Sequence, residues 1–202
     1  QTQDTFEPFD GFDLSKPQML GAENLHTRDT GFFRLEPGGE PKLLTMGSKS
    51  HGQPVKAKDA DVFLLTVQSF SSFPDYCVTT PDFKELKRVT EINPRVADFN
   101  WGKSELVYYT SGDGAKLSGV LVKPENFDPT KKYPMVVYIY ERMTQNTHTF
   151  RSPVVRAGQV INPTFYASNG YLVLMPDIAY QVGAPGQSAM KPGRFWFREP
   201  RP

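Results

Sequence analysis

Residues 131–140, KKYPMVVYIY, and residues 169–177, NGYLVLMPD, decide the fold of this chain. Each stretch holds an apolar run of β-branched and aromatic side chains, at 133–140 and at 171–175. A short segment with helical character lies between the two runs. The order therefore predicts a strand, a crossover that contains a helix, and a second strand. Strands joined in this way run parallel, and we expect both to be buried on their two faces.

End signals mark the crossover helix. Asn162 is a residue type that caps helix N-termini, and Pro163 suits the first helical turn. Asn169 and Gly170 are typical of a helix C-terminus, because both tolerate the left-handed backbone conformation. The helix is therefore expected to begin near Asn162 and to end at Asn169.

Ligands bind open α/β sheets just beyond the carboxyl ends of the strands. In this chain the rule points to Tyr140, Glu141 and Arg142 after the first strand, and to Asp177 after the second. These four residues are the first candidates for a site.

The chain before residue 99 reads as antiparallel β-structure. Aromatic residues make up 13% of the sequence, which also contains 18 Pro and 16 Gly, and this composition favours many short strands. Residues 1–30 carry no regular pattern and predict irregular chain. A hairpin is expected over 31–46, a strand over 61–70 that Phe73-Pro74 ends, and a second hairpin over 75–94.

The two hairpins resemble each other in the segments EPKLLTM and ELKRVTE, where Thr45 and Thr90 lie 45 residues apart. A period of about 40–50 residues is typical of β-propeller blades. A generic antiparallel meander is the alternative. A third hairpin is expected over 101–124, with its turn at 112–114, where glycines permit positive φ.

Composition excludes several classes of function. The net charge is +1, from 23 basic and 22 acidic residues, which argues against binding of nucleic acid or membrane surfaces through bulk charge. No run approaches the ~20 apolar residues of a membrane span, and the N-terminus does not read as a signal peptide.

We find no spacing typical of a metal site and no phosphate-binding loop, so no cofactor is predicted. Cys77 is expected to be a half-buried strand thiol.

Three motifs carry a family resemblance: TSGDGAKLSGVLVKP at 110–124, FDPTKKYPMVVYIY at 127–140 and NGYLVLMPD at 169–177. Together they resemble the prolyl oligopeptidase family of serine peptidases, in its dipeptidyl-aminopeptidase-like branch. The family pattern S-x-D-G-x-x-(L/I)-x-G-x-L-x-K-P is matched from Ser111 to Pro124.

The resemblance implies the last blades of a partial β-propeller over 1–98. It implies the N-terminal half of an α/β-hydrolase domain over 99–191. Residues 192–202 match neither part and read as an aberrant or disordered tail, so we expect the true sequence to diverge after Lys191.

The same resemblance implies a Ser-Asp-His triad whose serine stands in a G-x-S-x-G-G turn after a buried strand. The nearest match is centred on Ser188, but it follows a loop and has Met190 where glycine is needed. Ser188 is therefore not expected to be the nucleophile. Because the chain order in these hydrolases is Ser, acid, His, we expect the triad to lie beyond Lys191 and this chain alone to be inactive.

Tyr140 matches the family tyrosine whose hydroxyl donates to the oxyanion of the tetrahedral intermediate; a Tyr packed at a strand end is the alternative. Glu141-Arg142-Met143 replaces the glycine-containing turn that follows this Tyr in many relatives, so a different loop path is expected.

Arg142, with Glu141 beside it, is a candidate for substrate binding. Pairing of Arg142 with Glu141 or Asp177, or exposure to solvent, is the alternative. Asp177 is expected to be structural, and His148 to be a surface or loop residue.

The sequence thus predicts part of a serine peptidase that hydrolyses short peptides or N-terminal dipeptides. Its partner would be a peptide substrate, and the resemblance favours a periplasmic or secreted location. Two alternatives stay open: an esterase or acyl-peptide hydrolase on the same scaffold, and a non-catalytic β-rich binding module. Oligomeric state stays open as well.

Overall fold

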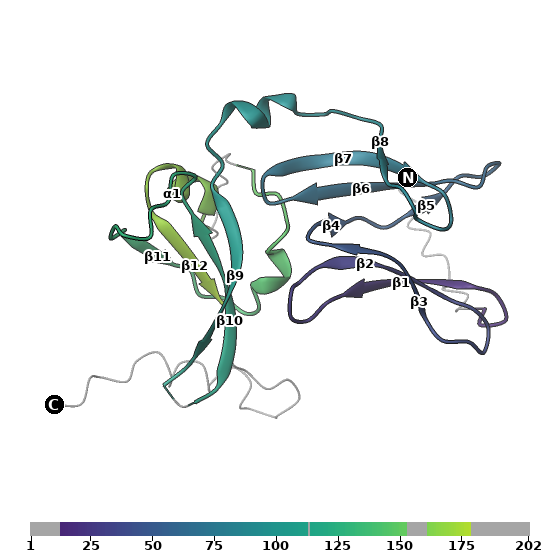
Figure 1. The fold of residues 1–202 in the computed structure, drawn as a ribbon, viewed down its shortest axis with the longest axis horizontal. Coiled ribbons are helices and arrows are strands. Elements are labelled where there is room, and N and C mark those ends of the chain that lie inside the picture. The colour runs from purple at the N-terminus through teal and green to yellow at the C-terminus, as the bar shows by residue number, and fades with distance from the viewer. Residues whose placement is uncertain (1–12, 113, 153–160, 179–202) are drawn as a thin grey trace, which may run out of the picture.

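The computed structural model describes residues 13–112, 114–152 and 161–178, which fold mostly into β-sheet with few helices (Figure 1). Within these residues the strands form two antiparallel sheets and one mixed sheet. In Figure 1 the two antiparallel sheets lie beside each other, and the mixed sheet stands at their side, with β9 and β10 running across the direction of the antiparallel strands.

The first antiparallel sheet has the order β1-β2-β3, formed by β1 (Gln18–Glu23), β2 (Thr30–Leu35) and β3 (Lys42–Gly47). The expectation of irregular chain over 1–30 is therefore wrong for β1, which pairs with β2 along its whole length. The segment QMLGAE lacks the alternation of a strand. Its extended conformation is set by the ladder with β2, a contact that local sequence does not reveal.

The second antiparallel sheet is centred on β6 (Phe63–Ser69) and β7 (Ser72–Thr79). The short strands β4 (Ser50–His51) and β5 (Val55–Lys56) pair with β6, and β8 (Lys87–Arg88) pairs with β7.

Pro74 lies inside β7 rather than ending the preceding strand, which corrects the expected break at Phe73-Pro74. The register between β6 and β7 shifts between Val67 and Ser69, opposite this proline. An irregularity of this kind is where a sheet accommodates a residue without an N–H group.

The mixed sheet has the order β11-β12-β10-β9. Its strands are β9 (Lys103–Thr110), β10 (Lys116–Lys123), β11 (Met135–Val137) and β12 (Leu172–Pro176). The predicted hairpin over 101–124 is confirmed as β9 and β10. The predicted parallel pair is confirmed as well, because β11 pairs with β12 in parallel.

The crossover helix is α1 (Pro163–Ser168), as its end signals predict. The side chain of Asn162 accepts a hydrogen bond from the Phe165 N–H, and Pro163 occupies the first turn. Gly170 follows the helix with a φ of +83°, a conformation that glycine adopts without strain. Two short 3-10 helices complete the described elements, η1 (Pro94–Asp98) and η2 (Thr144–Asn146).

The expectation that both parallel strands are buried on two faces is wrong for β11. In β12, Val173 and Met175 are buried, but in β11 Met135 and Val137 are 47% and 46% exposed. β11 is the edge strand of the sheet among the described residues, so one of its sides has no strand partner there.

Two clusters of buried apolar side chains pack the sheets against their neighbouring elements. One packs residues of the mixed sheet against α1 and the chain beside them, and its buried members are Phe70, Trp101, Val120, Val122, Met143, Ala167, Val173 and Met175. The other contains Phe32, Leu65, Val67, Cys77 and Phe83, from both antiparallel sheets. Each fully buried side chain of this size contributes about 1.5–3 kcal/mol.

Trp101 joins the mixed sheet to the second antiparallel sheet. Its indole N–H donates to the Phe70 carbonyl at 2.7 Å, and its ring stacks on Phe150 with 4.9 Å between centroids. Phe150 in turn contacts the ring of Phe73 in β7. The sheets are thus connected through buried aromatic side chains.

Candidate functional site

Tyr140 lies just beyond the carboxyl end of β11, in the loop that leads to η2. The loop is tied to the neighbouring strand on both sides of this residue. The Tyr138 N–H donates to the Leu174 carbonyl at 2.9 Å, and the Ile178 N–H donates to the Glu141 carbonyl at 3.2 Å. Tyr140 itself is 60% exposed, and its hydroxyl makes no hydrogen bond to any residue that the structure describes.

Asp177 follows β12 and binds the same loop through its carboxylate. Oδ1 accepts from the N–H groups of Met143 at 2.6 Å and Thr144 at 2.9 Å. Oδ2 accepts from the Thr144 hydroxyl at 2.6 Å and from the Ser118 hydroxyl of β10 at 3.1 Å. A carboxylate offers about four lone-pair positions, and these four donors occupy them. Asp177 therefore has a structural role, as expected from its place in the chain.

Arg142 pairs with Glu23 of β1, which was not among its expected partners. Its Nη2 lies 3.0 and 2.9 Å from the two carboxylate oxygens of Glu23. Arg28 shares this carboxylate, because its Nη1 lies 3.1 Å from Glu23 Oε1. Glu141 is exposed beside Arg142. The side chains of Glu141 and Arg142 therefore lie on the surface next to Tyr140, and Arg142 has a partner from the first sheet.

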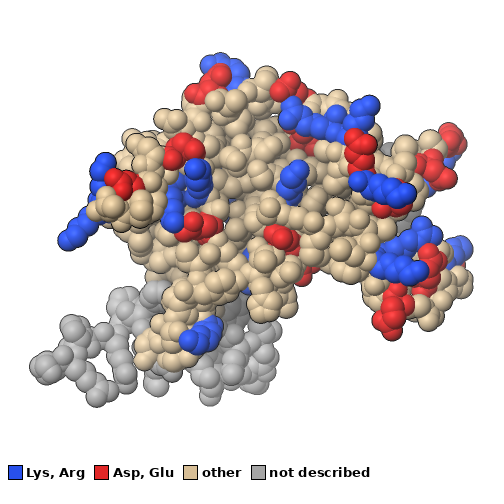
Figure 2. Space-filling model, viewed as in Figure 1, with Lys and Arg blue, Asp and Glu red and all other residues tan. Residues whose placement is uncertain are grey.

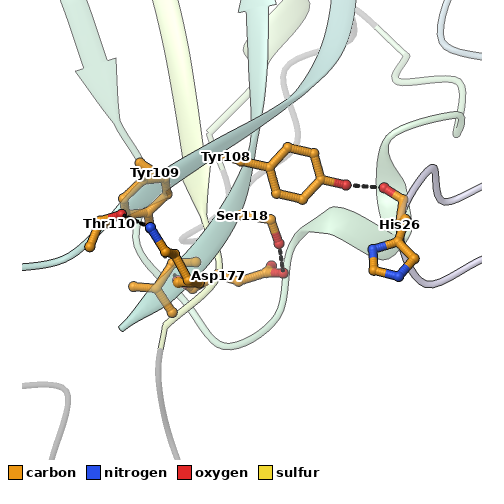
Figure 3. A pocket seen from close by; sticks show the side chains of 8 residues that line it. His26, Tyr108, Tyr109, Thr110, Ser118 and Asp177 are labelled. Atoms are coloured by element: carbon orange, nitrogen blue, oxygen red, sulfur yellow. Dashed lines mark hydrogen bonds between the residues drawn. The ribbon is translucent and has the colours of Figure 1, made fainter. Parts of the chain in front are cut away.

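A cavity of about 650 Å³ opens beside Asp177 (Figure 3). It is lined by His26, Tyr108, Tyr109, Thr110, Lys116, Leu117, Ser118 and Asp177. Burial, together with the negative charge of Asp177, raises the pKa of the Tyr109 phenol above its usual value of 10. The Tyr109 hydroxyl donates to the backbone carbonyl of Asp177 at 3.3 Å.

His148, expected to be a surface or loop residue, lies in the turn after η2. Its Nε2 lies 3.2 Å from Asp29 Oδ1 and 3.2 Å from the Thr27 carbonyl oxygen. These partners belong to the turn between β1 and β2.

Acidic and basic side chains are interspersed on the face that Figure 2 shows, in keeping with the net charge of +1. Among the described residues no cluster of His, Cys, Asp and Glu could hold a metal ion. No helix in the same part of the chain is long and apolar enough to cross a membrane.

Sequence reasoning did not find Glu23, which pairs with Arg142 of the loop, or Arg28, which pairs with Asp177. The signal was absent because they lie in a region without strand pattern, more than 110 residues before their partners. The sequence candidate Ser188 and the tail 192–202 lie outside the described residues.

No protein-family model matches this sequence. Among solved structures, the chain is similar to the AtxE2 isopeptidase with a TM-score of 0.62 and 12% identity, over 85% of this chain and 25% of that one. Dipeptidyl peptidase 4 of Porphyromonas gingivalis gives a TM-score of 0.59 and 17% identity, over 83% and 24%. Oligopeptidase B of Leishmania major gives 0.54 and 14%, over 81% and 23%.

The chain therefore spans about a quarter of the length of the enzymes that it matches. TM-scores of 0.54–0.62 establish a common fold, and at identities of 12–17% the likeness extends to the fold alone. The resemblance to the prolyl oligopeptidase family is thus confirmed at the level of the fold, which is that of one stretch of a peptidase of this family.

Proposed function

We propose that this chain contributes one oxyanion donor, the Tyr140 hydroxyl, to a serine peptidase that cleaves short peptides or N-terminal dipeptides. The observation that carries the proposal is the position of Tyr140, exposed and without a hydrogen-bond partner in the described chain, just beyond a parallel strand. The common fold with peptidases supports the reaction class.

Peptide hydrolysis by a serine requires a hydrogen-bond donor at the place where negative charge develops. When a serine attacks a peptide carbonyl, its oxygen becomes an oxyanion, and a donor aimed at that oxygen stabilises the transition state by about 3–4 kcal/mol. A Tyr hydroxyl is suited to this task because it stands at the tip of a rigid ring. The serine, acid and histidine of the triad, and the second oxyanion donor, would come from residues other than those described.

The proposal includes a division of the chain. Residues 99–191 would be the first half of an α/β-hydrolase domain, and residues 1–98 would be the last blades of a β-propeller. The mixed sheet with its parallel pair supports the first assignment, and the two antiparallel sheets support the second. β11 is the edge strand among the described residues, and its open edge is where a further strand would continue the sheet.

Arg142 and Glu141 are proposed as residues that contact the peptide. Arg142 binds Glu23 through Nη2. A guanidinium has five N–H donors, so the others can still donate to a peptide carbonyl or carboxylate. Glu141 is exposed at the same place and can accept from a peptide N–H.

A second candidate reaction is hydrolysis of acylated peptides or esters on the same scaffold. The likeness to an acylaminoacyl peptidase of Pyrococcus horikoshii favours it, with a TM-score of 0.53 and 14% identity. A non-catalytic β-rich binding module is the alternative outside the enzymes. A periplasmic or secreted location remains a proposal by resemblance.

Hydrolysis of chromogenic substrates by the natural gene product that contains this sequence tests the function. We expect release of nitroaniline from dipeptide nitroanilides, faster than from acetylated amino-acid nitroanilides or nitrophenyl esters, and complete inhibition by a serine-directed phosphonate. Faster turnover of the acetylated substrates or esters would favour the second reaction. Absence of turnover on all three, with the phosphonate unreacted, would favour the binding module. The 202-residue chain alone is expected to be inactive in the same assay.

A further inference from the structure

The loop that carries Tyr140 takes its path from Asp177. Two successive backbone N–H groups, those of Met143 and Thr144, point at one oxygen of this carboxylate, and the Thr144 hydroxyl binds the other. The three distances are 2.6, 2.9 and 2.6 Å. Met143 and Thr144 are themselves buried. The chain three residues beyond Tyr140 is thus fixed to the residue that follows the neighbouring strand.

Asp177 is in turn faced by Arg28, from the turn between β1 and β2. Arg28 Nη2 lies 3.7 Å from Asp177 Oδ2, and the two side chains are 11% and 14% exposed. Their charges are therefore little screened by water. Because Arg28 also binds Glu23, which binds Arg142, a chain of alternating charges runs Arg142–Glu23–Arg28–Asp177.

The backbone of Arg28 is held in an unfavourable conformation. Its φ is +63°, in the left-handed region that side chains other than Gly, Asn and Asp seldom adopt. The turn enforces it, because the Arg28 N–H donates to the Asn24 carbonyl and the Asn24 N–H donates to the Asp29 carbonyl, both at 2.8 Å. Strained residues of this kind cluster at functional sites, where the surroundings over-determine them.

Four successive residues of this turn contact the part of the chain beyond residue 100. The carbonyl of His26 accepts from the Tyr108 hydroxyl (Figure 3), and that of Thr27 lies against His148 Nε2. Arg28 faces Asp177, and Asp29 pairs with His148. These contacts hold the turn against the mixed sheet and the residues after η2. The position from which Arg28 pairs with Asp177 is therefore fixed.

We propose that Asp177 and Arg28 are positioning residues for Tyr140. Asp177 sets the path of residues 141–144, Arg28 neutralises and orients the Asp177 carboxylate, and together they aim the Tyr140 hydroxyl. This assignment rests on the proposed role of Tyr140 for its catalytic consequence. The structural part, that these two residues fix the Tyr140 loop, can be measured without catalysis.

The first arm measures the loop in the natural gene product. Asp177→Asn keeps the shape of the side chain and replaces one acceptor oxygen by a donor. We expect amide exchange at Met143 and Thr144 to accelerate about tenfold or more, since hydrogen bonds to a charged group are lost. In protein with ¹³C-labelled tyrosine rings, the Tyr140 signal, assigned by its absence in Tyr140→Phe, is expected to shift. Arg28→Met is expected to shift the Tyr140 signal as well. Its effect on amide exchange at Met143 and Thr144 is expected to be smaller than that of Asp177→Asn.

Matched controls exist in the chain. Asp82 also accepts from a threonine hydroxyl, that of Thr80 at 2.6 Å, but it stands in the turn after β7. Arg95 also pairs with an aspartate, Asp98 at 3.5 Å, on the surface. Asp82→Asn and Arg95→Met are expected to leave both readouts unchanged. Melting curves of every variant show whether it is folded, and Thr144→Val replaces Asp177→Asn if the latter is not.

The second arm measures peptide hydrolysis. Asp177→Asn is expected to lower kcat with little change in KM, and adding it to Tyr140→Phe is expected to cause no further loss, because it acts through that tyrosine. Losses that multiply would overturn the proposal, as would an unchanged Tyr140 signal and unchanged exchange in folded Asp177→Asn. If the wild-type protein hydrolyses nothing, the proposed function fails, while the first arm still decides whether Asp177 and Arg28 fix the loop.

Discussion

Asp177 and Thr144, 33 residues apart, are joined by two hydrogen bonds, one from the Thr144 N–H at 2.9 Å and one from its hydroxyl at 2.6 Å. The first residue follows β12 and the second begins η2, so the pair connects the segments that follow the two parallel strands. Because Thr144 is fully buried, its hydroxyl has no water to replace this carboxylate.

Thr144→Val keeps the shape of the side chain and removes the hydroxyl donor. We expect the free energy of unfolding to fall by about 1.5–3 kcal/mol, as for hydrogen bonds to charged groups. Thr130 provides the control, because its hydroxyl also donates to an aspartate, Asp128 at 2.7 Å, on the exposed surface. Thr130→Val should change stability by less than about 0.5 kcal/mol. Equal losses in urea unfolding of the two variants would contradict the structural role of Asp177.

The helix cap of α1 gives a second test. Asn162→Ala removes the acceptor of the Phe165 N–H, and we expect a loss of about 1 kcal/mol. Asn93 precedes η1 in the equivalent position but makes no side-chain cap hydrogen bond. Asn93→Ala is therefore expected to leave the thermal midpoint nearly unchanged. If both variants lose the same stability, the local cap does not set the start of the crossover helix.

Trp101 joins two sheets, so its replacement should affect the whole structure. Trp101→Phe leaves the buried Phe70 carbonyl without its donor and weakens the stack on Phe150, for a combined loss of about 2–4 kcal/mol. Phe165→Leu, on the exposed face of α1, is the control and is expected to cost under about 0.5 kcal/mol. Chemical denaturation followed by circular dichroism distinguishes the two. A Trp101→Phe protein as stable as Phe165→Leu would show that the sheets are held by other contacts.

Stability is expected to depend on the protonation of His51. Burial, with Lys49 nearby, lowers the pKa of this imidazole below its usual value of 6.5. As the pH falls through the usual value, the unfolded chain takes up the proton first, so the free energy of unfolding decreases with it.

His51→Gln should therefore lose less stability than the wild type between about pH 7.5 and pH 5.5. His26→Gln, in the exposed turn, is the control for the substitution itself. Identical pH profiles for wild type and His51→Gln would contradict a lowered pKa of His51 in the folded protein.

The open side of β11 predicts association. Met135, Val137 and Ile139 are exposed along this edge, and unpaired edge strands are templates for pairing with other chains. Val137→Lys should lower the light scattering of the 202-residue chain at little cost in stability. Val55→Lys on the exposed strand β5 is the control for added charge. If both substitutions reduce scattering equally, the edge of β11 is not the cause.

Local signals predicted the parts of the fold that local chemistry determines. Asn162 and Gly170 marked the ends of α1, and glycines marked the turn between β9 and β10. The parallel pair followed from two apolar runs joined by a helix. Strand β1 could not be predicted in this way, because its extended form depends on pairing with β2.

The residues of the candidate site also divide into those that local sequence reveals and those that it does not. Tyr140 and Asp177 were found from their places after strands, since that rule uses chain order alone. The partner of Arg142 is Glu23, 119 residues earlier, and the strained Arg28 lies in a turn that no local pattern marks. Contacts of this range depend on how the sheets dock, which local patterns in the sequence do not reveal.

Steady-state hydrolysis of a dipeptide nitroanilide by the natural gene product and its Tyr140→Phe variant decides whether Tyr140 is an oxyanion donor. Phenylalanine keeps the ring and removes the hydroxyl, so a role in the transition state predicts a fall in kcat of about 10²- to 10³-fold with KM nearly unchanged. A variant that keeps the wild-type kcat would contradict the proposed function of this chain.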